Sequence, residues 1–219
     1  MGNNSGNCYN SGPNDHLTEL ESKKSEPYYH QVNYKTSDNY NSNFNQKAED
    51  LSSKQIETYR TEKGDDGRIV SGYMKANETF EGEIKYPNMD HYKGQIKSNM
   101  ANGEGQMMYA SGDSYKGELL NDNKHGRGEL KMFNGNRYIG EFKDDKFDGQ
   151  GTFIFQNSNR YTGDYKDGKK HGKGKFEYAN GDFIDCVWVQ GKQNGKGTIF
   201  SNGEIKNGFW VNGHIQSME

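Results

Sequence analysis

The amino terminus carries two residues whose types and spacing suit covalent lipid attachment. Gly2 follows the first methionine, as N-myristoylation requires, but the pattern wants Ser or Thr at position 6, where this chain has Gly6 with Ser5 one place early. A single myristoyl chain binds a membrane only marginally, so stable residence needs a second anchor, and Cys8 is well placed for palmitoylation. The sequence therefore predicts lipidation at Gly2 and Cys8. The alternative is a low-complexity start in which these residues have no such role.

A dense basic segment offers a second kind of membrane contact. Residues 166–175 contain five lysines and one aspartate. Each Lys or Arg near an anionic leaflet contributes about 1 kcal/mol of attraction. The candidate contacts for a phosphoinositide head group are Lys169, Lys170, His171 and Lys173. The simpler interpretation, that they are solvated turn residues of an ordinary repeat, is favoured.

Residues with catalytic or metal-binding potential do not form a recognisable set. Residues 163–170 imitate the phosphate-binding loop Gly-x-x-x-x-Gly-Lys-Ser/Thr, but Lys170 stands where the magnesium-binding hydroxyl is needed, and no helix is expected to follow. His125 and His171 are two repeats apart, about 20 Å at the spacing of paired strands, whereas zinc–nitrogen bonds are about 2 Å long. No nucleophile, base and orienting group emerge together. We therefore predict that the protein is not an enzyme and has no metal site or cofactor.

The composition excludes further classes of protein. Of the 219 residues, 29% are hydrophobic, and the net charge is −3. No apolar run approaches the ~18 residues of a transmembrane helix, and the start lacks the basic and apolar regions of a secretory signal. Two cysteines cannot build a disulfide framework, and the near-neutral charge argues against nucleic acid as a partner. We expect an intracellular chain that does not span a membrane.

The chain divides into two unlike parts. Residues 1–64 are rich in Asn and Ser and poor in aliphatic side chains, so they cannot bury enough apolar surface to offset chain entropy. We predict a disordered tether there. Within it, the loose helical spacing of Ala48, Leu51, Ile56 and Tyr59 predicts a short helix over residues 46–61. Residues 65–219 carry most of the glycines, and there we predict the folded part.

The glycines of residues 65–219 are ordered in sequence with a step of 23 residues. The Gly-x-Gly pairs are Gly103/Gly105, Gly126/Gly128, Gly149/Gly151, Gly172/Gly174 and Gly195/Gly197. Pairs of the form Tyr-x-Gly keep the same step, at Tyr92/Gly94, Tyr115/Gly117, Tyr138/Gly140 and Tyr161/Gly163. Ile184 and Cys186 take the fifth place, where Cys186 should pack as a small apolar group. This self-similarity indicates a repeat array of about six units, the first degenerate and the last truncated.

Within each unit the hydrophobic period is two, which is typical of half-buried strands. Turn-forming residues separate the strands, so each unit should be one β-hairpin. Glycine in a strand marks a close approach by another group, and here an aromatic ring one strand away can lie over the bare backbone. The predicted fold is therefore all-β: an elongated, single-sheet antiparallel meander of hairpins, with an aromatic ladder on one face and polar side chains on the other.

The repeat resembles the MORN repeat (membrane occupation and recognition nexus). The residues that carry this resemblance are Tyr115-Lys-Gly-Glu-Leu with Lys124-His-Gly-Arg-Gly128, and Tyr161-Thr-Gly-Asp-Tyr with Gly168-Lys-Lys-His-Gly-Lys-Gly174. The match covers roughly residues 69–213. The resemblance implies an elongated β-meander, often dimeric, in scaffolds at membranes, cortical cytoskeleton, cell junctions and cilia.

Three functional hypotheses follow from these observations together. The leading one is a non-catalytic scaffold or adaptor that is tethered to the cytoplasmic face of a membrane by acylation and docks a protein partner. The second is a structural subunit of an axonemal or cortical cytoskeletal assembly without lipid anchoring. The third is a phosphoinositide-binding module. Pairing of two aromatic stripes could also produce a symmetric homodimer.

Overall fold

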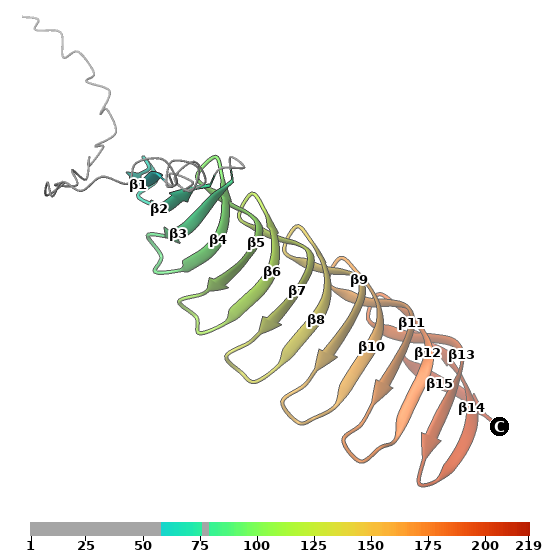
Figure 1. The fold of residues 1–219 in the computed structure, drawn as a ribbon. Helices are drawn as coiled ribbons and strands as arrows, with labels where there is room; N and C mark the ends of the chain where they lie inside the picture. Colours follow the sequence, from blue (N-terminus) through green and yellow to red (C-terminus); the bar gives the residue numbers. More distant parts are fainter. Residues whose placement is uncertain (1–57, 76–78) are drawn as a thin grey trace, which may run out of the picture. The chain divides into compact units, whose positions relative to one another are not determined.

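The computed structural model describes residues 58–75 and 79–219, which belong to one compact unit and form one open antiparallel sheet (Figure 1). Every strand pairs with its neighbours in chain order, so the sheet is an uninterrupted meander of curved strands. The predicted all-β hairpin fold is confirmed. The described residues include no helix long and apolar enough to cross a membrane. The strands are β1 Thr58–Lys63, β2 Ile69–Met74, β3 Phe80–Lys85, β4 His91–Lys97, β5 Met100–Met108, β6 Ser114–Leu120, β7 Asn123–Lys131, β8 Arg137–Lys143, β9 Lys146–Ile154, β10 Arg160–Lys166, β11 Lys169–Glu177, β12 Phe183–Val189, β13 Lys192–Ser201, β14 Glu204–Val211 and β15 His214–Met218.

The sheet begins earlier in the chain than the sequence pattern indicated. Residues 58–63, expected within the disordered tether, form β1 and pair with β2. The helix predicted over 46–61 is therefore wrong for residues 58–61, and the rest of it lies outside the described residues. The edge of β2 supplies backbone partners, and the rings of Tyr59 and Tyr73 lie 4.8 Å apart, so pairing outweighs a weak helical spacing.

Side chains alternate between two faces of unlike character. We call the face that carries the tyrosine series the tyrosine face and the opposite one the polar face. The four tyrosines are fully buried, and each hydroxyl donates a hydrogen bond to the backbone carbonyl three residues later, at 2.7–3.1 Å. The polar tip is thus satisfied while the ring packs in the core. The tyrosines are Tyr92, Tyr115, Tyr138 and Tyr161.

The second glycine of each Gly-x-Gly pair lies beneath a tyrosine ring in the first four pairs. A Cβ atom on Gly128 would stand 2.5 Å from Cζ of Tyr115, a distance that real Cβ atoms do not adopt. Gly105, Gly151 and Gly174 lie in the same way under the tyrosine of the preceding strand. Aromatic area is therefore buried against bare backbone, which explains how a chain poor in aliphatic residues builds a core.

The glycine of each Tyr-x-Gly pair serves a purpose different from the expected one. We expected a ring one strand away to cover it, but Gly94 faces the backbone of the next strand, where its Cβ would stand 2.5 Å from Cα of Gly105. Gly163 faces Gly174 in the same way, again at 2.5 Å from its Cα. The strand register shifts directly after Gly94 and after Gly163, so a β-bulge begins there. The requirement for glycine thus comes from two strands that approach glycine to glycine, and the equivalent residues of the other two repeats are Gly117 and Gly140.

The first glycine of each Gly-x-Gly pair is required for a third structural reason, which the sequence pattern does not reveal. It lies at the bulge of the hairpin and has a positive φ, for example 60° at Gly126. In the first four pairs, a polar side chain on the preceding strand accepts the N–H of the residue that follows this glycine, as Glu118 does from Arg127 at 3.0 Å. A Cβ on Gly126 would collide with that carboxylate. The bulge thus needs both the left-handed conformation and the empty space. The other first glycines, all with positive φ, are Gly103, Gly149, Gly172 and Gly195.

Side chains at the opposite turns join each repeat to the next. Asn136 accepts a hydrogen bond from the backbone N–H of Gln156 at 2.9 Å, and four equivalent residues do the same, each toward an N–H twenty residues later. Since the acceptor belongs to one repeat and the donor to its successor, these bonds fix the stacking of neighbouring hairpins. The other acceptors are Asp90, Asp113, Asn159 and Asp182.

The array changes its packing where the tyrosine series ends. Ile184 is half-buried at the fifth tyrosine position, and a Cβ on Gly197 would meet Cys186 there instead of a ring. Trp188, at the position of Tyr165 one repeat earlier, donates its indole N–H to the carbonyl of Gly174 at 2.8 Å. The Trp188 ring meets the Tyr161 ring edge-on at 5.2 Å. Cys186 is buried and not in a disulfide, and burial raises the pKa of its thiol to about 11. It packs as a small apolar group rather than as a reactive thiolate.

Candidate functional site

A recurring pair of residues at the hairpin turns creates comparable sites along the tyrosine face. Each turn between long strands has two residues with positive φ, the geometry that favours Asn, Asp and Gly. The second turn residue donates its N–H, at 2.9–3.0 Å, to a carbonyl that lies twenty-one residues earlier in the preceding hairpin. We call the residue that supplies this carbonyl, together with the turn residue that donates to it, a turn pair. The four that we compare are Ala101/Asp122, Lys124/Asp145, Phe147/Gly168 and Lys170/Gly191.

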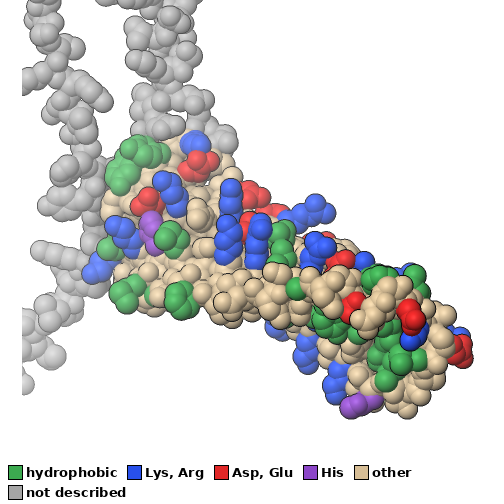
Figure 2. Space-filling view, turned by 90° about the horizontal axis from the view of Figure 1, so that it is seen from below, with side chains coloured by type: hydrophobic (Ala, Val, Ile, Leu, Met, Phe, Trp, Pro, Cys, Tyr) green, Lys and Arg blue, Asp and Glu red, His purple; other side chains and the backbone are tan. Residues whose placement is uncertain are grey.

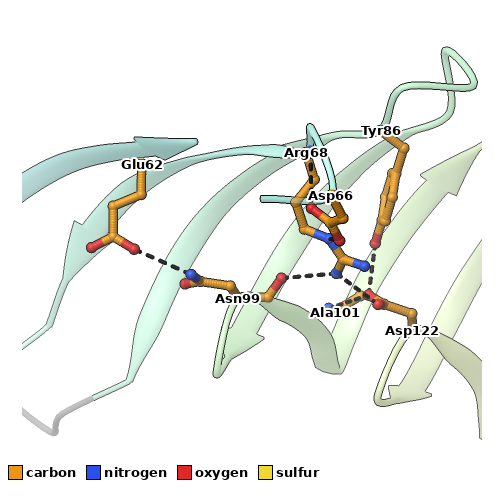
Figure 3. A network of polar contacts seen from close by, with 7 residues as sticks. All are labelled: Glu62, Asp66, Arg68, Tyr86, Asn99, Ala101 and Asp122. Carbon is orange, nitrogen blue, oxygen red and sulfur yellow. Dashed lines mark hydrogen bonds and ion pairs between the residues drawn. The ribbon is translucent and has the colours of Figure 1, made fainter. Parts of the chain in front are cut away.

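The aspartate of the first turn pair meets a cation, Arg68, which lies in the connection between β1 and β2 (Figure 3). The Asp122 carboxylate accepts hydrogen bonds from the Ala101 N–H and the Tyr86 hydroxyl, both at 2.7 Å. The Arg68 guanidinium reaches the same carboxylate at 2.9 Å and the carbonyl of Asn99 at 3.1 Å. Arg68 stands 54 residues before Asp122. The cation therefore ties the degenerate first unit to the repeats that follow.

The second turn pair contains both charges itself. Lys124 forms an ion pair with Asp145 at 2.7 Å and donates to the Tyr109 hydroxyl at 3.1 Å. Burial alone would lower the pKa of Lys124, but the hydrogen bonds to Asp145 and Tyr109 outweigh it and raise the pKa above its ordinary value. The first two turn pairs thus share one arrangement, in which an aspartate, a cation and a tyrosine hydroxyl meet.

The third turn pair is apolar. Phe147 takes the place of the lysine and stacks on the Tyr138 ring at 3.8 Å between centroids. Gly168 takes the place of the aspartate, and a Cβ atom there would meet nothing within 4 Å. Here the cation and the carboxylate are lost together.

The fourth turn pair keeps the cation but not the acid. Lys170 has an ammonium 4.5–5.5 Å from the centroids of four aromatic rings, and Gly191 replaces the aspartate, again with nothing within 4 Å of a Cβ. Within the described residues, this ammonium has no hydrogen bond or ion pair. Burial lowers the pKa of Lys170 to about 8. The four rings belong to Phe155, Tyr161, Phe176 and Trp188.

We expect the Lys170→Met variant to be more stable than the native chain by about 1 kcal/mol at pH 7, since cation–π attraction offsets only part of the burial cost. The native chain should gain stability as the pH rises from about 8 to the ordinary lysine pKa of 10.5, because only the unfolded chain is protonated there. The variant should not show this rise. Urea unfolding across this pH range measures both effects. Lys169→Met, at an exposed neighbour, should change neither, and a native profile that is flat would contradict the assignment.

The predicted anionic-lipid contacts are not gathered on one surface. Lys170 points into the aromatic rings of the tyrosine face, whereas Lys173 is exposed on the polar face, next to Gly174 beneath the Tyr161 ring. Lys169 is exposed, and the half-buried His171 has a ring Nδ1 without a hydrogen-bond partner. The predicted lipidation sites, Gly2 and Cys8, lie outside the described residues. In the part of the chain that is described, no three His, Cys, Asp or Glu side chains gather as metal ligands.

The polar face changes character toward its last strands. Its centre holds a shallow groove of ≈ 630 Å³ whose lining carries both signs of charge, with Lys116, Arg127 and Glu129 among the residues. On β12 and β14 four outward side chains are apolar and 40–42% exposed. Figure 2 shows hydrophobic side chains gathering at this end of the molecule. We call this set the apolar end, and it consists of Val187, Val189, Phe209 and Val211.

Repeat equivalence makes the apolar end unusual within its own chain. The positions of Val187 and Val189 correspond, in steps of 23 residues, to Asp164 and Lys166 on β10 and to Glu141 and Lys143 on β8. A neighbouring hollow of ≈ 390 Å³ is lined by Phe209 together with Lys196, Thr198, Asn207 and Ser217. The sequence contains this signal, since aligning the repeats reveals the replacement of charged residues by Val187 and Val189.

A comparison with protein families matches this repeat geometry. The MORN repeat family matches residues 92–114, 115–137, 138–160, 161–183 and 187–205, which together make up more than half of the chain. The comparison with curated proteins found no significant match.

The solved structures that are similar to this chain include two TCP domains. The TCP domain of Drosophila melanogaster SAS-4 (dCPAP), in complex with a proline-rich motif of Ana2 (dSTIL), is 19% identical with a TM-score of 0.40, covering 68% of this chain and 88% of that one. A single-residue variant of the TCP10 domain of Danio rerio CPAP is 14% identical with a TM-score of 0.39, covering 74% and 94%. On these five matched repeats, this chain belongs to the MORN repeat family.

Proposed function

We propose that this chain is a non-catalytic scaffold that docks a protein partner on the apolar end of its polar face. The observation that carries the proposal is the exposure of Val187, Val189, Phe209 and Val211. Val187 and Val189 stand at positions that are mostly charged in the earlier repeats. Leaving such side chains in water forfeits about 25 cal/mol for each Å² that a partner could cover. Apolar surface rimmed by polar residues is typical of protein–protein contacts.

The tyrosine series cannot serve as the docking stripe, because its rings are fully buried. A partner that uses the tyrosine face would meet the side chains around those rings instead. This narrows the leading hypothesis, in which either the aromatic ladder or the polar face could dock a protein. The apolar end remains as the surface where uncovered apolar groups are concentrated.

In this proposal the amino terminus holds the scaffold at the cytoplasmic face of a membrane through acyl chains on Gly2 and Cys8. The support is the sequence pattern, because one acyl chain alone binds only marginally and Cys8 offers the second anchor. A cytoskeletal or axonemal subunit without lipid is the alternative.

A pair of matched variants tests the docking surface. The double variant Val187→Lys with Phe209→Lys should lose its protein neighbours in proximity labelling in cells. Thr152→Lys with Thr162→Lys adds equal charge to the middle of the same face and should keep them. A neighbour that distinguishes the two variants is then purified, and its binding is measured directly. Equal labelling by both variants would contradict docking at the apolar end.

The tether is tested in the same cells by intact mass and membrane flotation. We expect a myristoyl mass on the native chain and loss of flotation in Gly2→Ala and in Cys8→Ser. An unmodified mass without flotation would remove the tether from the proposal and favour the cytoskeletal alternative. The docking experiment stands in either case, since it depends on other residues.

A further inference from the structure

Comparing the four turn pairs reveals one incomplete site. Where a cation is present in the first two pairs, an aspartate of the chain meets it, at 2.9 Å for Arg68 and 2.7 Å for Lys124. Where the aspartate is absent in the third pair, Phe147 has replaced the lysine. Among these four pairs, only the fourth has a cation, Lys170, and a glycine at the position where the aspartate stands in the first two pairs.

The space for the missing acid is open. Gly191 donates its N–H to the Lys170 carbonyl at 2.9 Å, just as Asp145 donates to the Lys124 carbonyl at 3.0 Å, and both residues have a positive φ. A Cβ on Gly191 would meet nothing within 4 Å. A side chain at Gly191 can therefore leave the backbone unobstructed, and the carboxylate that Asp145 offers to Lys124 has no counterpart there.

The surroundings of Lys170 make a carboxylate the fitting ligand. Its ammonium is half-buried among four aromatic rings and lacks a charge partner within the described residues. A carboxylate brought there would form a charge-assisted hydrogen bond in surroundings of low dielectric, where it is stronger than in water. The rings would pack against the apolar neighbours of that acid.

We propose that Lys170 binds an acidic side chain, Asp or Glu, of a docked protein partner, which enters the space left by Gly191. This rests on the proposed function, since it assigns to the scaffold a second contact on its tyrosine face. An anionic lipid fits less well, because a phosphoinositide head group carries several phosphates, whereas Lys170 and Lys173 lie on opposite faces.

The chain itself suggests the decisive variant. Gly191→Asp would supply the carboxylate from within, as Asp145 does for Lys124. Asp122 and Asp145 adopt φ of 70° and 67° at the equivalent turn position, so the backbone of Gly191, with φ of 85°, suits aspartate. Gly168→Asp is the matched control, because it adds the same charge at an equally open turn that faces Phe147 rather than a lysine.

The probe is a phage-displayed random peptide library, panned on the full chain and counter-selected on the Gly191→Asp variant. We expect the recovered peptides to carry an Asp or Glu beside apolar residues. Their affinity should fall at least tenfold on Gly191→Asp, on Lys170→Met, and when the peptide acid becomes its amide. It should persist on Gly168→Asp. Thermal unfolding of each variant verifies that the fold is retained.

Three results would overturn the inference. They are peptides without an acid, equal affinity for native and Gly191→Asp chains, and failure to recover any peptide sensitive to Gly191→Asp. In a separate experiment, the chain and its variants are tested for binding to vesicles of phosphatidylcholine with phosphatidylinositol bisphosphate. Vesicle binding by the native chain that is lost in both Gly191→Asp and Lys170→Met would show that the space binds a phosphate instead. If neighbours still depend on Val187 and Phe209, the proposed function stands while this inference fails.

Discussion

Replacing Tyr138 by alanine is expected to lower the free energy of unfolding by about 3–5 kcal/mol. The Tyr138 ring is fully buried, stacks on Phe147 at 3.8 Å and meets Phe142 and Tyr165 edge-on at 5.0 and 5.2 Å. Its removal opens a cavity, uncovers the backbone of Gly151 and ends several ring contacts at once. Urea unfolding followed by circular dichroism measures the loss.

The control is another aromatic residue in the same repeat array. Phe133 is 81% exposed, so Phe133→Ala should change the free energy of unfolding by no more than about 0.5 kcal/mol. Because repeats contact chiefly their neighbours, hydrogen exchange in Tyr138→Ala should increase most in the strands beside β8. A loss below about 1 kcal/mol for Tyr138→Ala would show that the tyrosine series is not the core.

The second large effect is expected from a single added methyl group. Gly151→Ala should cost about 3 kcal/mol, because the new Cβ would stand 2.5 Å from Cζ of Tyr138. The ring cannot easily retreat, since its hydroxyl is bonded to the Glu141 carbonyl at 3.0 Å and its face is covered by Phe147. Chemical denaturation of the purified chain measures the difference.

Two further variants separate this clash from backbone strain. Gly168 has φ of 80° and open space around its Cβ position, so Gly168→Ala should cost only the left-handed conformation, about 1 kcal/mol. In a Tyr138→Leu background, Gly151→Ala should cost less than it does alone, because the ring that it strikes is gone. Equal costs at Gly151 and Gly168 would indicate that the ring does not set the requirement for glycine.

Much of the fold could be predicted because its rule is local and repeated. The spacing seen at Tyr115, Gly117 and Gly128 recurs in each of the first four units and determines which residues pair between strands. The alternation of side chains determines which of them lie on each face of the sheet. The contact that requires a glycine at a given position is harder to predict, because it involves a neighbouring strand. Gly126 and Gly128 look alike in sequence, yet one lies beside the Glu118 carboxylate at a bulge and the other beneath a ring.

The parts that could not be predicted depend on contacts between distant residues. Arg68 meets Asp122 across 54 residues, and nothing in the local pattern of either residue indicates the other. The sequence places Lys170 and Lys173 in one basic segment, whereas strand alternation puts their side chains on opposite faces. The missing aspartate at Gly191 was visible in the repeat spacing, but its meaning required the geometry of Lys124 and Asp145.

The bond from each repeat's turn to the next repeat has an evolutionary consequence. Asn136 accepts a hydrogen bond from the N–H of Gln156, and Asn159 accepts one from the N–H of Ala179. Each unit therefore donates one such bond to the unit before it and accepts one from the unit after it. An in-frame duplication of one whole 23-residue unit would therefore arrive with both its connections already made. An insertion between an acceptor and its donor that is not a whole number of units would change the twenty-residue separation between them. Lineages of this chain should lengthen or shorten by complete units, and the pairing of Lys170 with Gly191 could be inherited, copied or erased in a single genetic event.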